Sequence, residues 1–139
     1  MAKLTSRQKE ARRLAEWKKF LKDESDWDWA PILRVLAYKI RRTRKFLTSA
    51  QAASIPPRGP MIKIMKQVED LLEKVSRDEY SNVYDWKNIK LEHVKDDWHL
   101  KPKVRAEVRR RLKQADKDRD KDLRKAFDLI ATHIYEWWD

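Results

Sequence analysis

The residues best suited to chemistry form a mixed basic and aromatic face between positions 34 and 45. If this segment is helical, one of its faces carries Arg34, Tyr38, Arg41, Arg42 and Lys45, and Lys39 lies at the edge of that face. Guanidinium groups pair with phosphate oxygens in a fork, and an aromatic ring stacks on a base. The pattern predicts a site for a phosphorylated, nucleotide-type ligand. The alternative is a solvated helix surface.

A second set of cations surrounds the expected start of the last helix. Its members are Lys101, Lys103, Arg105, Arg109, Arg110 and Arg111. Free backbone N–H groups at a helix start also favour anions, so Arg105 and Arg109 are further candidates for ligand binding. Trp138 is another, because on a helix it points about 100° away from Trp137 and could meet a ligand or a second subunit. The sequence leaves open whether these surfaces meet in space.

No combination of side chains predicts catalysis. The chain has no cysteine, which excludes disulfides, thiolate zinc sites and cysteine nucleophiles. Its histidines are His93, His99 and His133. None has metal-site spacing with carboxylates, and His133 fits a partly buried structural role. Asp26 and Asp28 could bind a metal or cap a helix, and we favour the caps. We therefore expect no catalytic residue, no metal and no cofactor.

Helices must position these side chains. The expected helices cover residues 6–22, a segment from the Asp26–Asp28 region to 47, residues 60–76 and residues 103–138. Thr5 and Gln8 have the spacing of a capping box, and Pro31 falls in the first turn of the second helix. Residues 49–60 contain three prolines and the only glycine, which predicts a linker that neither neighbouring helix crosses.

Apolar side chains at helical spacing define the expected core. The predicted apolar faces are Leu4, Ala11, Leu14, Trp17 and Leu21 for the first helix, and Met61, Met65, Val68, Leu72 and Val75 for the third. Trp17, Trp29 and Trp137 lie on apolar faces and are predicted to be buried. The apolar face of the last helix is thin near its middle, where Arg119 and Asp122 could pair and the helix could kink or cross a polar contact in an assembly. For residues 78–102 the sequence predicts turns with one short helix. The alternative is a strand over residues 89–94.

Composition limits the class of protein. The chain has 139 residues, a net charge of +11 and one glycine, which disfavours phosphate-binding glycine loops and tight β-hairpins. The sequence shows no signal-peptide pattern and no apolar run long enough for a membrane span. We expect an all-α fold, a single helical domain of about four helices with a long C-terminal helix. The interrupted apolar face of that helix favours a homo-oligomer.

Two segments carry a resemblance. The first is Asp26-Trp27-Asp28 followed by Ile32-Leu33, Leu36, Lys39-Ile40 and Arg42; the second is Asp122-Leu123, Phe127, Leu129-Ile130, His133 and the closing Trp137-Trp138-Asp139. Together they resemble a group of small helical proteins encoded by tailed bacteriophages, which have a Trp-Asp pair before a helix and end in Trp-Trp-Asp. In that group the positions of Leu123 and Phe127 are often Trp. The resemblance covers less than a third of the chain.

The resemblance implies a phage accessory protein in the cytoplasm of an infected bacterial cell. Some such proteins hold nucleotide-derived immune signals in basic, aromatic pockets without cleaving them, commonly as oligomers. Our leading hypothesis is therefore a non-catalytic anti-defence protein that binds a nucleotide-derived small molecule, such as a cyclic dinucleotide or an ADP-ribose-type signal. The alternatives are nucleic-acid binding, which the net charge favours, and inhibition of a host protein. We expect no membrane partner.

Overall fold

The computed structural model describes residues 3–22, 28–49, 59–80, 91–94 and 97–137. Its elements are α1 (Ser6–Leu21), α2 (Ala30–Leu47), α3 (Gly59–Ser76), β1 (Leu91–Val94), β2 (Asp97–Leu100), α4 (Pro102–His133) and the 3₁₀ turn η4 (Ile134–Trp137). The expected all-α class is confirmed, with four helices in the described residues and a long C-terminal one. None of these helices has an apolar stretch that could cross a bilayer.

The helix ends agree closely with the sequence signals. The capping box is present: the Thr5 amide donates to Gln8 Oε1 at 2.8 Å, and the Gln8 amide donates to Thr5 Oγ1 at 3.3 Å. Pro31 lies in the first turn of α2, as predicted, but the N-cap is Trp29 and not an aspartate. Asp28 still accepts a hydrogen bond from the Ala30 amide at 3.4 Å. Asp26 lies outside the described residues.

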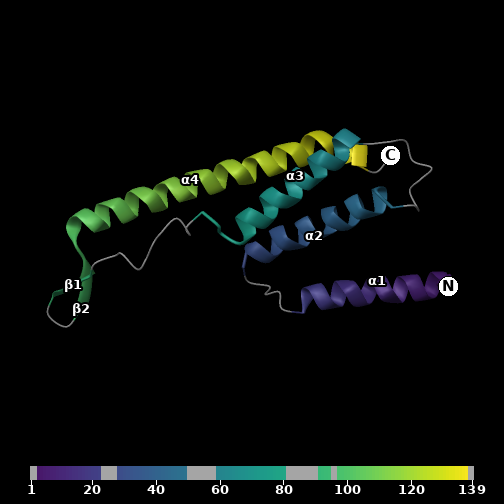
Figure 1. Cartoon of the computed structure of the whole chain (residues 1–139), viewed down its shortest axis with the longest axis horizontal. Coiled ribbons are helices and arrows are strands. Elements are labelled where there is room, and N and C mark those ends of the chain that lie inside the picture. Colours follow the sequence, from purple (N-terminus) through teal and green to yellow (C-terminus); the bar gives the residue numbers. More distant parts are fainter. Residues whose placement is uncertain (1–2, 23–27, 50–58, 81–90, 95–96, 138–139) are drawn as a thin grey trace.

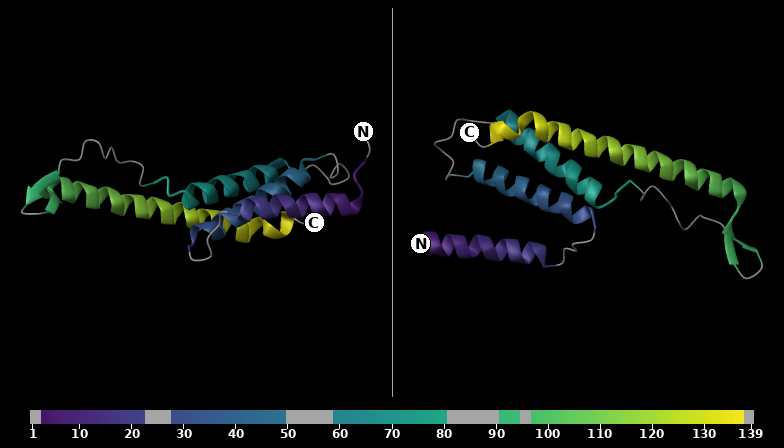
Figure 2. Two further views of the ribbon diagram at one scale, coloured as in Figure 1. Left: turned by 90° about the horizontal axis from the view of Figure 1, so that it is seen from below. Right: turned by 180° about the vertical axis from the view of Figure 1, so that it is seen from behind.

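The four helices follow one another across the molecule (Figure 1). α3 packs between α2 and the C-terminal half of α4, and α1 lies along the outer side of α2. The first half of α4 extends well beyond the ends of α2 and α3 and leads back to the β1–β2 hairpin, as the further views also show (Figure 2). α2 is thus the helix between an inner neighbour, α3, and an outer one, α1.

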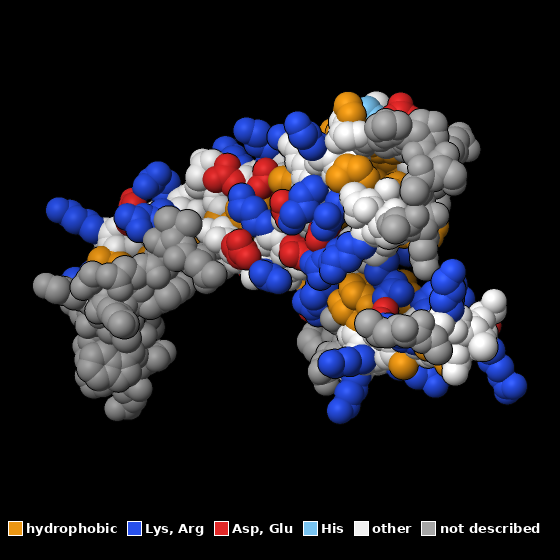
Figure 3. Space-filling view, turned by 45° about the vertical axis from the view of Figure 1, so that its right-hand side comes forward, with side chains coloured by type: hydrophobic (Ala, Val, Ile, Leu, Met, Phe, Trp, Pro, Cys, Tyr) orange, Lys and Arg blue, Asp and Glu red, His pale blue; other side chains and the backbone are white. Residues whose placement is uncertain are grey.

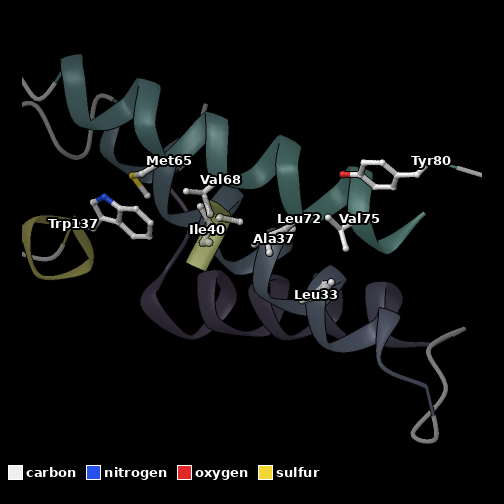
Figure 4. Close-up of a cluster of buried hydrophobic side chains, with 10 residues drawn as sticks. Leu33, Ala37, Ile40, Met65, Val68, Leu72, Val75, Tyr80 and Trp137 are labelled. Carbon is white, nitrogen blue, oxygen red and sulfur yellow. The ribbon is translucent and has the colours of Figure 1, made fainter. Parts of the chain in front are cut away.

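The apolar core lies where α2, α3 and the end of the chain meet (Figure 4). α2 contributes Leu33, Ala37 and Ile40; α3 contributes Met65, Val68, Leu72 and Val75; Ala126, Trp137 and Tyr80 complete it. The four α3 side chains have no exposed surface, which confirms the predicted apolar face of this helix. Trp137 is buried as predicted. Tyr80 belongs to the stretch 78–102, for which the sequence predicted turns with one short helix and no core residue was expected.

Two of the three tryptophans predicted to be buried are not fully buried in the structure. Trp29 is 48% exposed, so that prediction is wrong: it is the N-cap residue and precedes the first turn of α2. Trp17 is half-buried. The whole of α1 contains no buried residue, and Leu14 on its apolar face is 49% exposed.

α4 is unbroken from Pro102 to His133, so the expected kink is absent. The expected Arg119–Asp122 pair is also absent. Arg119 instead pairs with Asp116 at 2.8 Å and with Asp78 at 3.4 Å. Asp122 accepts hydrogen bonds from Lys74 and Tyr80, so the thin part of the apolar face is a polar crossing between the end of α3 and α4 of the same chain.

The β1–β2 hairpin corrects a further expectation. Its strands are antiparallel, with Val94 opposite Asp97, so two residues separate them. β1 lies within the strand that the sequence offered as its alternative for residues 89–94. The low glycine content, which we took to disfavour tight hairpins, did not prevent this pairing.

Candidate functional site

The interface between α2 and α3 neutralises part of the predicted basic face. Glu69 on α3 is 2% exposed and accepts from Arg41 Nε at 2.7 Å and from Arg44 Nε at 3.0 Å. Arg41 also pairs with Glu73. Charge-assisted hydrogen bonds of this kind hold both guanidinium groups against α3. Arg41 therefore has a structural role in addition to its predicted place near a ligand.

The interface between α1 and α2 is aromatic and ionic. The Tyr38 ring stacks on Phe20 with centroids 4.1 Å apart, and the edge of Trp17 lies 4.9 Å away. Arg42 pairs with Glu16 and donates from Nη1 to the Tyr38 hydroxyl at 3.2 Å. The hydrogen bond from Arg42 lowers the pKa of Glu16, and the same contact raises the pKa of Arg42. One face of Tyr38 is thus already covered by protein.

Two hollows adjoin each other along this interface and share Arg42. The first, of about 330 Å³, is lined by Arg13, Lys39, Arg42, Thr43, Phe46, Leu47 and Trp137. The second, of about 410 Å³, is lined by Glu16, Tyr38, Arg41, Arg42 and Lys45. We name them the aromatic hollow and the tyrosine hollow. Among the described lining residues, the aromatic hollow has three cations and no carboxylate, whereas Glu16 lowers the charge of the tyrosine hollow.

The aromatic hollow combines groups that suit an anionic ligand with a flat ring. Arg13 extends from α1, whereas Lys39 and Arg42 lie one turn apart on α2. Phe46 is 49% exposed and offers ring surface, whereas Trp137 is 2% exposed. The buried Trp137 Nε1 has no hydrogen-bond partner within the described structure. Pockets of small ligands are mainly apolar with a few placed polar groups, and this hollow fits that description.

The structure brings some predicted site residues together and separates others. Tyr38, Lys39, Arg41, Arg42 and Lys45 all line one of the two hollows. Arg34 is half-buried on α2 and lines neither.

Arg105 and Arg109 are exposed on the first half of α4, far from α2 (Figures 1 and 2). The two predicted basic patches therefore do not form one site. Trp138 lies outside the described residues.

Sequence reasoning missed five residues of the aromatic hollow, and three of them, Arg13, Phe46 and Trp137, supply its charge or its rings. Arg13 was one of many cations of α1, and only the position of α1 against α2 brings it to Lys39. Phe46 follows Lys39 by seven residues, two helical turns, and that spacing could have identified it. Trp137 was assigned to the core, where it is, and it also forms part of the wall.

Charge is distributed unevenly over the surface. Figure 3 shows acidic side chains mainly over the middle of the molecule, whereas Lys and Arg dominate near the N-terminal end of α4 and around α1. His133 is half-buried, as predicted, and its Nδ1 lies 3.2 Å from Glu136 Oε2. No group of three potential metal ligands occurs in the described part of the chain. No protein-family model, curated protein or solved structure matches this sequence.

Proposed function

We propose that the protein binds a phosphorylated, nucleotide-type ligand at the α1–α2 interface and does not cleave it. The aromatic hollow carries this proposal, because its described walls hold three cations and two aromatic rings with no carboxylate. An isolated basic surface would attract any polyanion. A hollow with cations beside rings selects anions that also have a flat, apolar part.

Different residues of the aromatic hollow bind different parts of the ligand. Arg13, Lys39 and Arg42 bind phosphate oxygens from two helices, and the exposed ring of Phe46 supports the base. The volume of about 330 Å³ lies at the lower end for small-ligand sites, which suits a ligand of nucleotide size. The tyrosine hollow continues beyond Arg42 and provides space for a second unit of a larger ligand.

Glu16 forms an ion pair with Arg42 in the unliganded protein. Its carboxylate makes the contacts that a phosphate oxygen of the ligand would make with the same guanidinium group. A phosphate must displace or share this carboxylate, and both partners are partly solvated, which keeps the exchange inexpensive in free energy. The ligand then replaces one contact between α1 and α2 with contacts to both helices.

The resemblance to small phage proteins extends the proposal to a biological role. We propose an accessory protein in the cytoplasm of an infected bacterium that sequesters a nucleotide-derived defence signal. Exposed apolar side chains on or just before α1 and towards or just beyond the C-terminal end of α4 support the self-association expected from the sequence; they are Leu4, Leu14, Leu21, Phe127 and Tyr135. Exposed apolar side chains that gather into one patch often mark protein interfaces.

Thermal unfolding in the presence of nucleotides tests the proposal. The panel contains cyclic dinucleotides and trinucleotides, ADP-ribose, NAD, unphosphorylated nucleosides and a short DNA duplex. A ligand that binds only the folded state adds RT ln(1 + [L]/Kd), about 2.7 kcal/mol at 100 times Kd. We expect one phosphorylated nucleotide to raise Tm by several degrees and its nucleoside to leave Tm unchanged.

Paired variants locate the effect. Arg13→Gln with Lys39→Gln removes two cations of the aromatic hollow, and Arg7→Gln with Lys63→Gln removes the same two residue types from exposed positions on α1 and α3. The first pair should abolish the ligand-induced shift, and the second should retain it. A panel without any shift from a small molecule would contradict the proposal and leave a protein partner as the better explanation.

A further inference from the structure

A periodic row of cations runs along α4, apart from the site proposed above. Every fourth residue from position 101 to position 125 is basic, and each is exposed: Lys101, Arg105, Arg109, Lys113, Lys117, Lys121 and Lys125. Residues four apart on a helix are neighbours on its surface, so the row is continuous. Nothing in the proposed nucleotide site uses it.

Helix geometry limits how many of these cations share one face. Four residues advance the chain by about 6 Å and turn it by about 40° beyond a full turn. Four successive members therefore lie within an arc of about 120°, whereas all seven wind more than half-way round the helix. We name the first four, Lys101, Arg105, Arg109 and Lys113, the distal stripe. It lies on the part of α4 that extends beyond α2 and α3 (Figure 2).

The two halves of the row have different surroundings. Between positions 101 and 115 the only acidic residue is Glu107. It accepts from Arg110 Nη2 at 2.8 Å and from Arg111 Nε at 2.6 Å, and these bonds hold its pKa at about 2. Glu107 is thus paired with arginines outside the distal stripe. The later cations Lys117, Lys121 and Lys125 instead share a hollow with Asp120 and Asp128.

We propose that the distal stripe binds the phosphate backbone of double-stranded nucleic acid. The stripe is about 18 Å long, a distance over which one strand of a B-form duplex presents about five phosphates. Exposed cations at regular intervals along about 18 Å of helix match such a row of charges. Arg105 and Arg109, which the structure separates from the α2 face, have their role here.

The neighbouring residues favour a duplex and sequence-independent binding. Residues 101–115 include no aromatic side chain, and proteins that bind single strands rely on rings that stack on bases. The stripe consists of Lys and Arg alone, and both side chains bind phosphate oxygens. Its contacts are therefore of the kind that position a protein on the backbone.

Two triple variants with equal charge test the assignment. Lys101→Gln with Arg109→Gln and Lys113→Gln removes three cations from the distal stripe, and Lys117→Gln with Lys121→Gln and Lys125→Gln removes three from the later half of the same helix. Binding is measured by fluorescence anisotropy on two duplexes of unrelated sequence between about 50 and 200 mM salt. Circular dichroism confirms that both variants are folded.

The distal variant should bind both duplexes at least ~10-fold more weakly at the lower salt and lower the slope of log K against log salt by about 3. The control variant should retain most of the affinity and of the slope. Equal losses in the two variants would overturn the proposal, since net charge alone would then explain binding. Failure of the unmodified protein to bind a duplex, or equal binding of single strands or anionic vesicles, would overturn it too.

Discussion

The two helices that flank α2 are held to it in different ways. α3 presents Leu72 and Val68 without exposed surface, and its buried Glu69 pairs with two arginines of α2. α1 has no buried residue and contacts α2 mainly through half-buried rings around Tyr38. The inner interface buries apolar area and neutralises cations. The outer interface leaves cations around hollows.

The difference in energy follows from these contacts. Each aromatic pair contributes about 0.5–1.5 kcal/mol beyond its area, and a partly exposed ion pair such as Glu16–Arg42 less than about 1 kcal/mol. Fully buried side chains each contribute about 1.5–3 kcal/mol, and α3 has four. The inner interface therefore determines stability, and the outer one is weak enough to adapt to a ligand.

The largest expected effect is a loss of stability in the core. Leu72→Ala leaves a cavity at a fully buried position and should lower the free energy of unfolding by about 3 kcal/mol. Leu14→Ala, at a position of α1 that is 49% exposed, should change it by less than about 0.5 kcal/mol. Urea unfolding measures both. Similar losses would show that α1 is part of the core and end the contrast between the interfaces.

The next effect concerns the buried carboxylate. Glu69→Gln removes the charge that Arg41 and Arg44 share and should cost about 2 kcal/mol, less than a fully buried pair because Arg41 is partly solvated. Asp70→Asn is the control on the same helix, because Asp70 is exposed and pairs with the exposed Lys66. It should cost less than about 1 kcal/mol. Equal losses of unfolding free energy in the two variants would show that Glu69 contributes no more to stability than an exposed carboxylate.

A smaller effect lies at the crossing of α3 and α4 and depends on pH. Burial alone would raise the pKa of Asp122, but hydrogen bonds from Lys74 at 2.8 Å and Tyr80 at 2.6 Å bring it below its ordinary value. A depressed pKa adds stability that is fully present above the unfolded value, about 3.9, and is lost as pH falls through the folded value.

Asp122→Asn should therefore destabilise the protein by about 1 kcal/mol at neutral pH, the usual net value of a hydrogen bond, and by less at acid pH. Asp120→Asn, at an exposed neighbour, should show neither change. Chemical unfolding between about pH 3 and pH 7, a range that spans the unfolded pKa, measures the difference. A pH-independent cost in Asp122→Asn would contradict the ionic part of this contact.

The smallest effect on the whole protein is expected in α1. Thr5→Ala removes the capping box and costs about 1 kcal/mol of local helix stability. Because α1 is weakly held, this cost should appear as faster amide exchange in α1 and leave the unfolding of the core almost unchanged. A matching loss in global stability would mean that α1 unfolds together with the core.

Local signals in the sequence predicted the fold well. The capping box at Thr5 and the prolines around 49–60 placed the neighbouring helix boundaries within one residue, and the predicted apolar face of α3 is buried at Leu72 and Val68. The end of the last helix was predicted wrongly: the α-helix ends at His133 and not at 138, and residues Ile134–Trp137 form a 3₁₀ turn. These features depend on neighbours along the chain. An amphipathic pattern does not show whether another element covers it, so the exposure of Leu14 could not be foreseen.

The candidate site was predicted only in part, because the sequence pattern groups residues of one helix but does not show which other elements contact them. Helical spacing grouped Tyr38, Lys39 and Arg42 on α2, and they do line the hollows. The partners come from distant segments: Glu69 is 28 residues from Arg41, and Tyr80 is 42 residues from Asp122. Such pairs follow from the packing of helices and leave no local pattern.

Amide hydrogen exchange in the absence and presence of a nucleotide tests the central claim most directly. The nucleotide is the one that raises Tm most in the thermal panel. In the free protein, α1 should exchange much faster than α3, and the ligand should slow exchange in residues 13–20 and 38–47 while α3 changes little. Slow exchange of α1 without ligand, or protection by the nucleotide elsewhere in the chain, would contradict the account.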